Sequence, residues 1–161
     1  MVKYHMNKAE REITDPDVIT EILKTSKYAI IGMCRGKEPY VVTLSYGYDK
    51  GPNCLYFHSA PKGLKLDFIA ENPEVCATVI EDNGYVKDKC SHRYRSLVLR
   101  GKMYVVAEEE EKLHGMDVIA RQLEDDSDAR QKKLRNLPGA EWSRLTVLRL
   151  DIEEMTGKAG Q

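Results

Sequence analysis

Two strand-like runs, residues 40–48 and 54–58, flank a short turn and lead at once into a helical stretch. Both runs are rich in β-branched and aromatic residues, which favour strands. The turn, residues 49–53, contains glycine and proline, so the two runs predict an antiparallel hairpin. The helix is predicted over residues 61–71, directly after the second strand. This order favours an antiparallel sheet with helices at its connections.

Four further runs of the same kind extend this pattern. Strands are predicted at residues 28–33, 75–80, 96–107 and 142–152. Helices are predicted to begin at Asp15-Pro16 and to cover residues 108–123, which start with acidic side chains. The polar stretch 81–90 is expected to be a loop or a wide hairpin. The chain shows no βαβ alternation and no G-x-G-x-x-G motif. The prediction is therefore a mainly β fold, a closed six-stranded antiparallel barrel of Greek-key type with helical connections.

Two glycines inside predicted strands indicate local irregularities, because glycine weakens a strand. Gly47 indicates a bulge or a close approach of another backbone, and Gly101 indicates a bend in the long fifth strand. The strand around Gly47, residues 41–48, is one candidate binding element. A plain core strand is an equally good interpretation of that run.

The junction of the second hairpin strand with the helix is a candidate anion site. Ser59 is able to cap a helix and Pro61 suits a first helical turn. A helix start has unpaired backbone N–H groups and a partial positive charge, to which Lys62 and Lys65 add. Phosphate is the usual anion at such a position. The alternative is an ordinary helix cap with two solvated lysines. For His58, which precedes this junction, the alternative to a functional role is a structural histidine.

Length and charge limit the class of protein. The 161 residues suit one domain, residues 1–161, with a substantial hydrophobic core. The formal net charge of −1 argues against a nucleic-acid partner held by bulk electrostatics. The most apolar run, residues 28–34, is too short to cross a bilayer, and the N-terminus has no apolar signal core. We therefore expect no membrane partner and, by default, a cytoplasmic location.

The cysteines and histidines do not predict a metal site. The four cysteines, at positions 34, 54, 76 and 90, show no C-x-x-C spacing. Three of them lie in apolar, strand-like runs, where free cysteine behaves as a small buried hydrophobic residue. No cysteine has histidines near it at zinc-ligand spacing.

A donor-rich segment, residues 91–96, enters the fifth predicted strand. It contains His92, Tyr94 and two arginines, and arginine binds phosphate or carboxylate with two parallel hydrogen bonds. The alternative is a cationic segment that balances the acidic helix starting near Glu108.

In combination, these segments resemble a known family, the FMN-binding split barrel of the pyridoxamine-phosphate oxidase superfamily, and in particular its nitroimidazole-resistance (Nim) branch. The matching pieces are Asp15-Pro16, Pro39-Tyr40-Val41-Val42 through Gly47-Tyr48, Tyr56-Phe57-His58-Ser59-Ala60 with Gly63 and Lys65, Asn72-Pro73, Tyr94-Arg95-Ser96 and Thr156-Gly157-Lys158. The likeness extends from about Arg11 to Ala159.

The resemblance implies a homodimer that binds two FMN molecules at the subunit interface. By position, Val42, Thr43 and Leu44 are expected to line the isoalloxazine ring through their backbone. His58 and Ser59 are expected beside the ring and the ribityl chain. Lys65 is expected to hold the phosphate, supported by Lys62. Arg95 and Ser96 are expected to approach from the fifth strand.

Three departures from the oxidase pattern argue against oxidation of pyridoxamine phosphate. Leu64 stands before Lys65 where the oxidases have an arginine, and Val41 stands at the position of their arginine in the second strand. Near the C-terminus Arg149 is present, but no histidine follows it.

The leading functional hypothesis is an FMN-dependent reductase that passes electrons from a nicotinamide to a small acceptor such as a nitro compound. The flavin supplies the redox chemistry, and His58 is the candidate catalytic residue, as a proton donor. One alternative is a non-catalytic flavin or small-molecule binding protein. Another is a barrel of the same family with a different cofactor, either haem bound through His58 or a deazaflavin.

Overall fold

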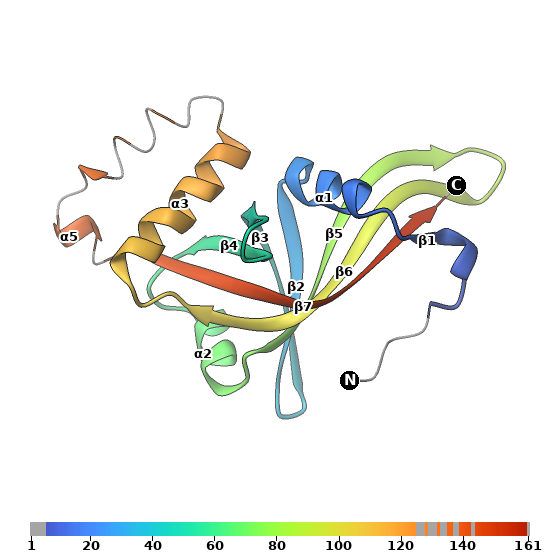
Figure 1. The fold of residues 1–161 in the computed structure, drawn as a ribbon. Coiled ribbons are helices and arrows are strands. Elements are labelled where there is room, and N and C mark those ends of the chain that lie inside the picture. Colours follow the sequence, from blue (N-terminus) through green and yellow to red (C-terminus); the bar gives the residue numbers. More distant parts are fainter. Residues whose placement is uncertain are drawn as a thin grey trace.

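The computed structural model describes residues 6–124, 128, 132, 135, 136, 139–142 and 144–160. Its centre is one antiparallel sheet that closes on itself (Figure 1). The strands are β1 (Glu12–Ile13), β2 (Tyr28–Arg35), β3 (Glu38–Asp49), β4 (Cys54–Ser59), β5 (Glu74–Val86), β6 (Ser91–Val105) and β7 (Thr146–Gly160). The helices are the short 3-10 turn η1 (Ala9–Arg11), then α1 (Pro16–Thr25), α2 (Leu64–Glu71), α3 (Glu109–Leu123) and α5 (Gly139–Trp142).

Pairing of β6 with β7 closes the sheet into a barrel. The strand order is β1-β7-β4-β3-β2-β5-β6, and every neighbouring pair is antiparallel. Six strands form the ring, and β1 is added outside it, on the edge of β7 beyond the end of β4. The predicted six-stranded antiparallel barrel is confirmed, with a seventh strand of two residues among those that the structure describes.

Alternating side chains of the strands fill the barrel. The inner face of β3 presents Tyr40, Val42, Leu44 and Tyr46 to the core, as the period of two requires. Two helices complete this core, because Ile22 and Leu23 of α1 and Phe68 and Ile69 of α2 are buried in the same cluster. The predicted start of α1 is confirmed: Asp15 is the N-cap, and its carboxylate accepts a hydrogen bond of 2.8 Å from the N–H of Asp17.

Helix α3 lies on the outer face of the sheet and forms a second, smaller core with it. Met116 and Ile119 of α3 pack there against Cys54, Tyr56 and Val147. The close approach predicted at Gly47 is confirmed. A Cβ at that position would lie 2.6 Å from backbone atoms of Val118 and Ile119.

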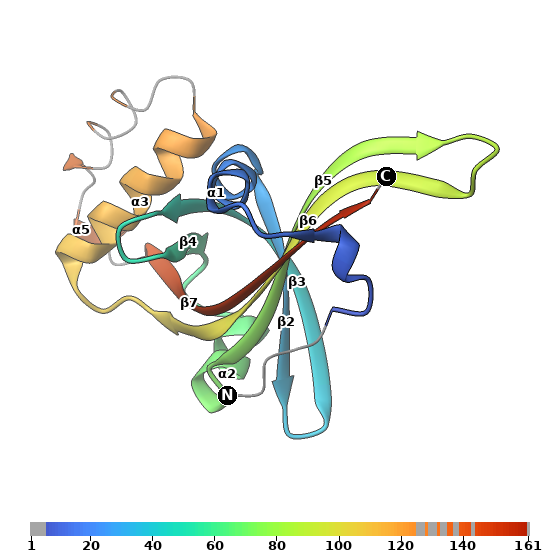
Figure 2. The same cartoon turned by 45° about the vertical axis from the view of Figure 1, so that its right-hand side comes forward.

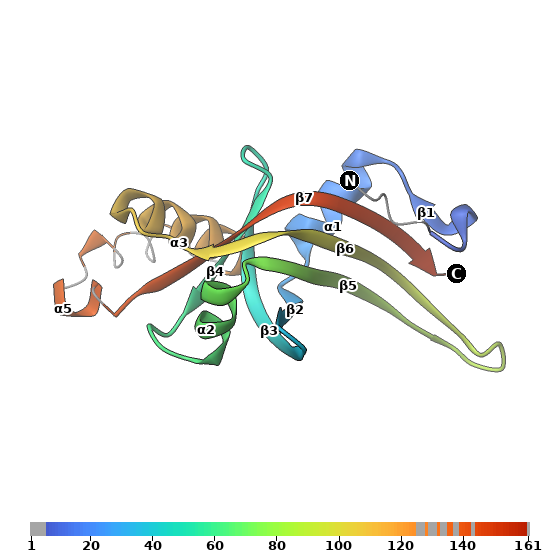
Figure 3. The ribbon, with the colours of Figure 1, turned by 90° about the horizontal axis from the view of Figure 1, so that it is seen from below.

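Strands β5, β6 and β7 continue side by side beyond the barrel as a curved arm (Figures 2 and 3). Of the two expectations for residues 81–90, a loop or a wide hairpin, the structure confirms the hairpin. β5 runs to Val86 and pairs with β6 up to the turn at residues 87–90. The polar residues and Gly84 produce a register shift between Asp82 and Tyr85 instead of ending the strand.

Helix α2 begins later than predicted, at Leu64 instead of residue 61. Its N-cap is Gly63, with φ of 148°, and no side chain caps the helix. Ser59 is still part of β4, where it pairs with Thr146, and its hydroxyl donates to the carbonyl of Ala60. Ser59 therefore does not cap the helix, and Pro61 lies before its first turn.

The last strand is displaced from its predicted range of 142–152. Trp142 ends the short helix α5, and β7 runs from Thr146 to Gly160. The irregularity expected at Gly101 is present as a register shift between β6 and β7 at Arg100 and Gly101. In the part of the chain that the structure describes, no helix is both long and apolar enough to cross a membrane.

We expect Gly47→Ala to lower the free energy of unfolding by about 2 kcal/mol, because the new methyl group overlaps the α3 backbone and neither backbone can yield cheaply. Urea unfolding measures this effect. Gly51→Ala is the matched control: its Cβ has one neighbour, the Asp49 carboxylate at 3.6 Å, and the change should stay within about 0.5 kcal/mol. Equal stability of the two variants would contradict the close approach of α3.

Candidate functional site

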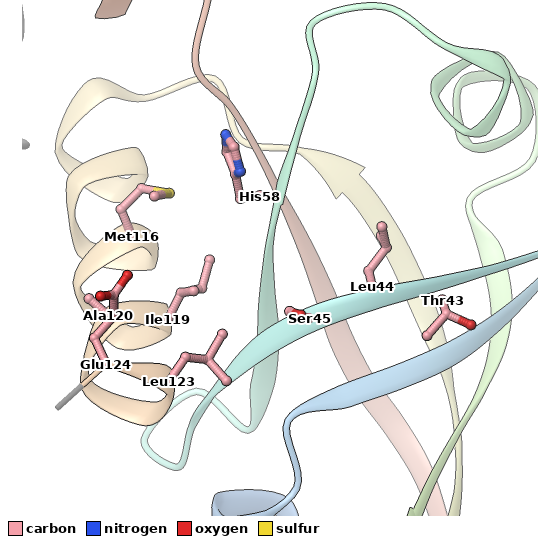
Figure 4. A pocket seen from close by; sticks show the side chains of 9 residues that line it. All are labelled: Thr43, Leu44, Ser45, His58, Met116, Ile119, Ala120, Leu123 and Glu124. Atoms are coloured by element: carbon pink, nitrogen blue, oxygen red, sulfur yellow. The ribbon is translucent and has the colours of Figure 1, made fainter.

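A pocket of about 330 Å3 opens where β3 and β4 separate beneath α3 (Figure 4). The strands contribute Thr43, Leu44, Ser45 and His58, and the helix contributes Met116, Ile119, Ala120, Leu123 and Glu124. Its volume lies at the low end of the range of about 300–1,000 Å3 that is usual for small-molecule sites. The pocket can therefore hold one small molecule or one part of a larger ligand.

The separation of β3 from β4 leaves backbone groups available beside this pocket. β3 pairs with β2 up to Ser45, and it pairs with β4 only from Tyr46 onward. The N–H of Tyr46 donates to Lys27, on the β2 side. Because the backbone groups of an antiparallel strand alternate in direction, those of Thr43 and Ser45 point away from β2, toward the open edge. Those of Val42 and Leu44 point to β2. An open edge of this kind can hydrogen-bond a planar ligand that has amide-like groups.

His58 lies on β4 at the point where this strand has left β3. It pairs with Val147 of β7, and its side chain is exposed to the pocket. Figure 4 shows its ring on the side of the pocket opposite Met116. An imidazole in this position can exchange a proton with a bound molecule.

The wall opposite His58 is one face of α3. Met116, Ile119, Ala120 and Leu123 follow the i, i+3, i+4, i+7 spacing of a single helix face. The sequence analysis treats the acidic start of this helix but assigns none of its residues to a site. Such a stripe signals burial, and nothing in its pattern separates the residues that reach the sheet from those that border a cavity.

Gln122 fixes the C-terminal half of α3 to the barrel. Its side-chain oxygen accepts a hydrogen bond of 2.8 Å from the N–H of Tyr48. This N–H has no partner on β2, because β2 pairs with β3 only up to Ser45. Its amide donates to the carbonyls of Leu23 and Ser26 at the end of α1, at 3.1 Å and 2.7 Å. One side chain thereby satisfies three backbone groups and holds the wall of the pocket in place.

The candidate anion site lies farther along the same connection, between β4 and α2. Lys62 is exposed in the bend before the helix, and Lys65 is half-exposed in its first turn. Neither lysine forms an ion pair with another residue of the described part of the chain. As far as the described residues are concerned, both ammonium groups can therefore meet an anion.

Arg95 and Ser96 point to opposite faces of β6, so they do not meet at one site. The Arg95 guanidinium is paired with Glu81 of β5 and with Glu21 of α1, the latter at 3.2 Å. Hydrogen bonds to these two carboxylates raise its pKa. Ser96 borders a second pocket, of about 300 Å3, on the outer face of the arm, together with Thr78, Ile80, Asp82, His92 and Tyr94.

Arg149 is held in the second core instead of facing an open site. Its guanidinium contacts Glu111 of α3 and Asp151 of β7, each at 2.7 Å, and it lies over the ring of Tyr56. Burial lowers its pKa, but the hydrogen bonds to both carboxylates outweigh this and leave the pKa above its ordinary value. This arginine ties α3 to the sheet.

The cysteines are all free thiols. Cys54 is buried, and burial raises its pKa to about 11, so the thiol is protonated near neutral pH and is a poor nucleophile. Among the described residues, no three His, Cys, Asp or Glu side chains gather in an arrangement that could hold a metal ion.

Comparison with known proteins identifies the family. The model of the pyridoxamine 5'-phosphate oxidase family matches residues 15–159. The chain belongs to this family. No curated protein matches this chain.

Solved structures share the oxidase-family fold over most of the chain. A candidate 5-nitroimidazole antibiotic resistance protein from Bacteroides thetaiotaomicron is 28% identical, with a TM-score of 0.77 over 92% of this chain and 86% of that one. The flavocytochrome Anf3 from Azotobacter vinelandii has a TM-score of 0.80 at 19% identity, over 97% of this chain and 72% of that one. The FAD and heme binding protein from Mycobacterium smegmatis has a TM-score of 0.76 at 20% identity, over 94% and 74%. At 19% and 20% identity, the likeness to the last two proteins shows a shared fold and nothing about function.

Proposed function

We propose that this member of the oxidase family binds FMN and works as a reductase, passing electrons from a nicotinamide to a small acceptor such as a nitro compound. The observation that carries the proposal is the open backbone edge of β3 next to the His58 pocket. The likeness to the 5-nitroimidazole resistance protein supports the choice of acceptor.

The proposed flavin lies along β3 and reaches the start of α2. The ring accepts and donates hydrogen bonds at the open edge through the backbone of Thr43, while Val42 and Leu44 support that edge from the core side. His58 and Ser59 lie next to the ring and the ribityl chain. The phosphate binds Lys65 and Lys62, whose ammonium groups have no partner among the described residues. A helix start and two cations suit a phosphate ester.

In the proposed reaction, the flavin supplies the redox chemistry and the protein supplies position and protons. Overall, NADH and one proton reduce a nitro group to a nitroso group, and NAD+ and water are formed. The nitro compound takes up two electrons and two protons. One of these protons originates from the nicotinamide hydride and the other from solution. His58 is proposed to deliver a proton at the pocket, as a general acid.

We further propose a homodimer that pairs through the outer face of the sheet and completes the flavin site. Register places Tyr28, Val41 and Ile80 on that face, and they are 53%, 62% and 45% exposed. Exposed apolar side chains of this kind on one sheet face are typical of an interface. Ser96 lies on the same outer face and can approach a flavin bound to the partner, whereas Arg95 supports the arm through α1.

Two alternative functions would use the same fold. A non-catalytic flavin or small-molecule binding protein would use the same edge and the same lysines. A haem or deazaflavin protein would use the same barrel, and the two haem-containing structural relatives favour a test for haem. The absorption spectrum of the freshly purified protein identifies a haem protein, because haem gives a Soret band and flavin does not. Oxidation of a nicotinamide separates a reductase from a non-catalytic flavin protein.

We expect the protein to take up FMN stoichiometrically, as measured by quenching of flavin fluorescence. Lys65→Ala should weaken binding about tenfold or more, and Lys62→Ala somewhat less, because each removes a charged hydrogen bond to the phosphate. Lys50→Ala, in an exposed turn, is the matched control. Arg95→Gln should change affinity little, because its partners are protein carboxylates. Absence of uptake, or uptake unaffected in the double lysine variant, would falsify the proposal.

With FMN bound, we expect steady oxidation of NADH or NADPH coupled to a nitroimidazole. His58→Ala should retain the flavin and lower the turnover number by about 100-fold, the usual contribution of a general acid. His58→Gln, which keeps the size and polarity, should be equally slow. If His58→Ala turns over like the parent protein, the proton-transfer role is wrong. If the loaded protein oxidises neither nicotinamide, the non-catalytic alternative is favoured.

We expect sedimentation equilibrium to give twice the chain mass. Val41→Lys should weaken the dimer, because it puts a charge on the apolar outer face. Val105→Lys is the control. This valine is 46% exposed, but it is the cross-strand partner of the core residue Leu148, so both lie on the inner face of the sheet. A monomeric parent protein, or equal association of both variants, would contradict the proposed interface.

A further inference from the structure

The His58 pocket has two chemically different sides. The α3 side consists of Met116, Ile119, Ala120 and Leu123, which offer carbon and sulfur atoms to a ligand (Figure 4). The sheet side carries the polar groups of Thr43, Ser45 and His58. A flat molecule between them would pack one face on the helix and direct its polar substituent to His58. Aromatic and heteroaromatic rings have this shape and polarity.

The charges around the pocket argue against an anionic ligand. The described residues that line it include one carboxylate, that of Glu124, and no lysine or arginine. A phosphate or carboxylate placed there would lose its water without gaining a cationic partner among the described lining residues, which is costly. The lysines of the β4–α2 connection do not line this pocket. Among the described lining residues, none is suited to bind the phosphate of a pyridoxamine substrate.

The size of the pocket depends on two residues of α3. Ala120 is 3% exposed and is the smallest side chain of the wall, so its small size leaves the space. Leu123, one turn further on, is only half-buried and stands at the end of the helix. Gln122 holds this turn against the barrel through Tyr48 and α1, so the wall cannot retreat from a larger ligand.

We propose that this pocket is the binding site of the electron acceptor and that it selects small, flat, uncharged aromatic compounds, with Ala120 and Leu123 setting the size limit. The inference rests on the proposed flavin function. It adds the substrate class and two specificity-determining residues. The flavin lies at the edge of β3, and the acceptor lies beside it against α3, within reach of His58.

The test compares acceptors of different size on the full chain loaded with FMN. Ala120→Leu should lower kcat/KM for a nitroimidazole by about tenfold or more, since a few carbon atoms in a tight pocket have effects of this order. Leu123→Ala should act in the opposite direction and raise kcat/KM for a nitronaphthalene relative to the nitroimidazole. Ala107→Leu, an exposed position before α3, is the control.

Charge selection is tested with a matched pair, 4-nitrobenzamide and 4-nitrobenzoate. The neutral compound should be reduced at least about tenfold more efficiently. The proposal is overturned if acceptor size has the same effect in the parent, Ala120→Leu and Leu123→Ala proteins, or if the anion is the better substrate.

Failure of the flavin function is recognised separately. Binding of FMN and dioxygen consumption are measured first, and they report on the proposed function alone. If either is absent, equilibrium dialysis of 4-nitrobenzamide tests the pocket directly. Binding that Ala120→Leu abolishes and Ala107→Leu preserves supports the pocket as an aromatic site. No binding to the parent protein overturns it. Because Ala120 is buried, thermal unfolding is used to check that the Ala120→Leu protein is folded. If that protein does not fold, Leu123→Ala still tests the proposal.

Discussion

The separation of β3 from β4 is the constraint on which the candidate site depends. The barrel closes because β7 pairs with β4 on one edge and with β6 on the other. To stay on β7, β4 must leave β3 after Phe57, and β3 continues with β2 alone. Backbone groups that lose a strand partner must find another. The pocket, the exposed ring of His58 and the open edge at Thr43 all follow from this one divergence.

Helix α3 turns that divergence into an enclosed site. It approaches the sheet closely because Gly47 and Gly115 have no side chains: a Cβ on Gly115 would lie 2.7 Å from the ring of Tyr56. Arg149 and Glu111 join one end of the helix to the sheet, and Gln122 joins the other end to β3 and α1. His114 adds a contact of 2.6 Å to Asp49 at the end of β3. The wall of the pocket is thus held by polar contacts on both sides of an apolar stripe, which is a rigid basis for selecting a ligand.

Much of the fold could be predicted from local patterns. The period of two in β3, the cap at Asp15 and the two irregular glycines are local signals, and the structure has the features that they predicted. The errors also have local causes. A serine and a proline before α2 are typical of a helix start, but Ser59 is retained by its partner Thr146 in the sheet. The composition of the polar stretch 81–90 left a loop and a wide hairpin open, and pairing with β6, which extends β5 to Val86, decides for the hairpin. Arg95 and Ser96 are neighbours in sequence, and the alternation of a strand places them on opposite faces.

The sequence by itself determined the antiparallel class, the barrel, the family and the position of His58 and the two lysines next to one another along the chain. These properties depend on periodicity, on turn residues and on short motifs, all of which act over a few residues. Only the tertiary structure decided which edge of β3 is open, which face of α3 borders the pocket, and that Arg95 and Arg149 are neutralised by carboxylates. These depend on the register of strands far apart in the sequence and on a helix that returns to the sheet some sixty residues after β3. Pairing over such separations is a property of the closed barrel, and no local pattern specifies it.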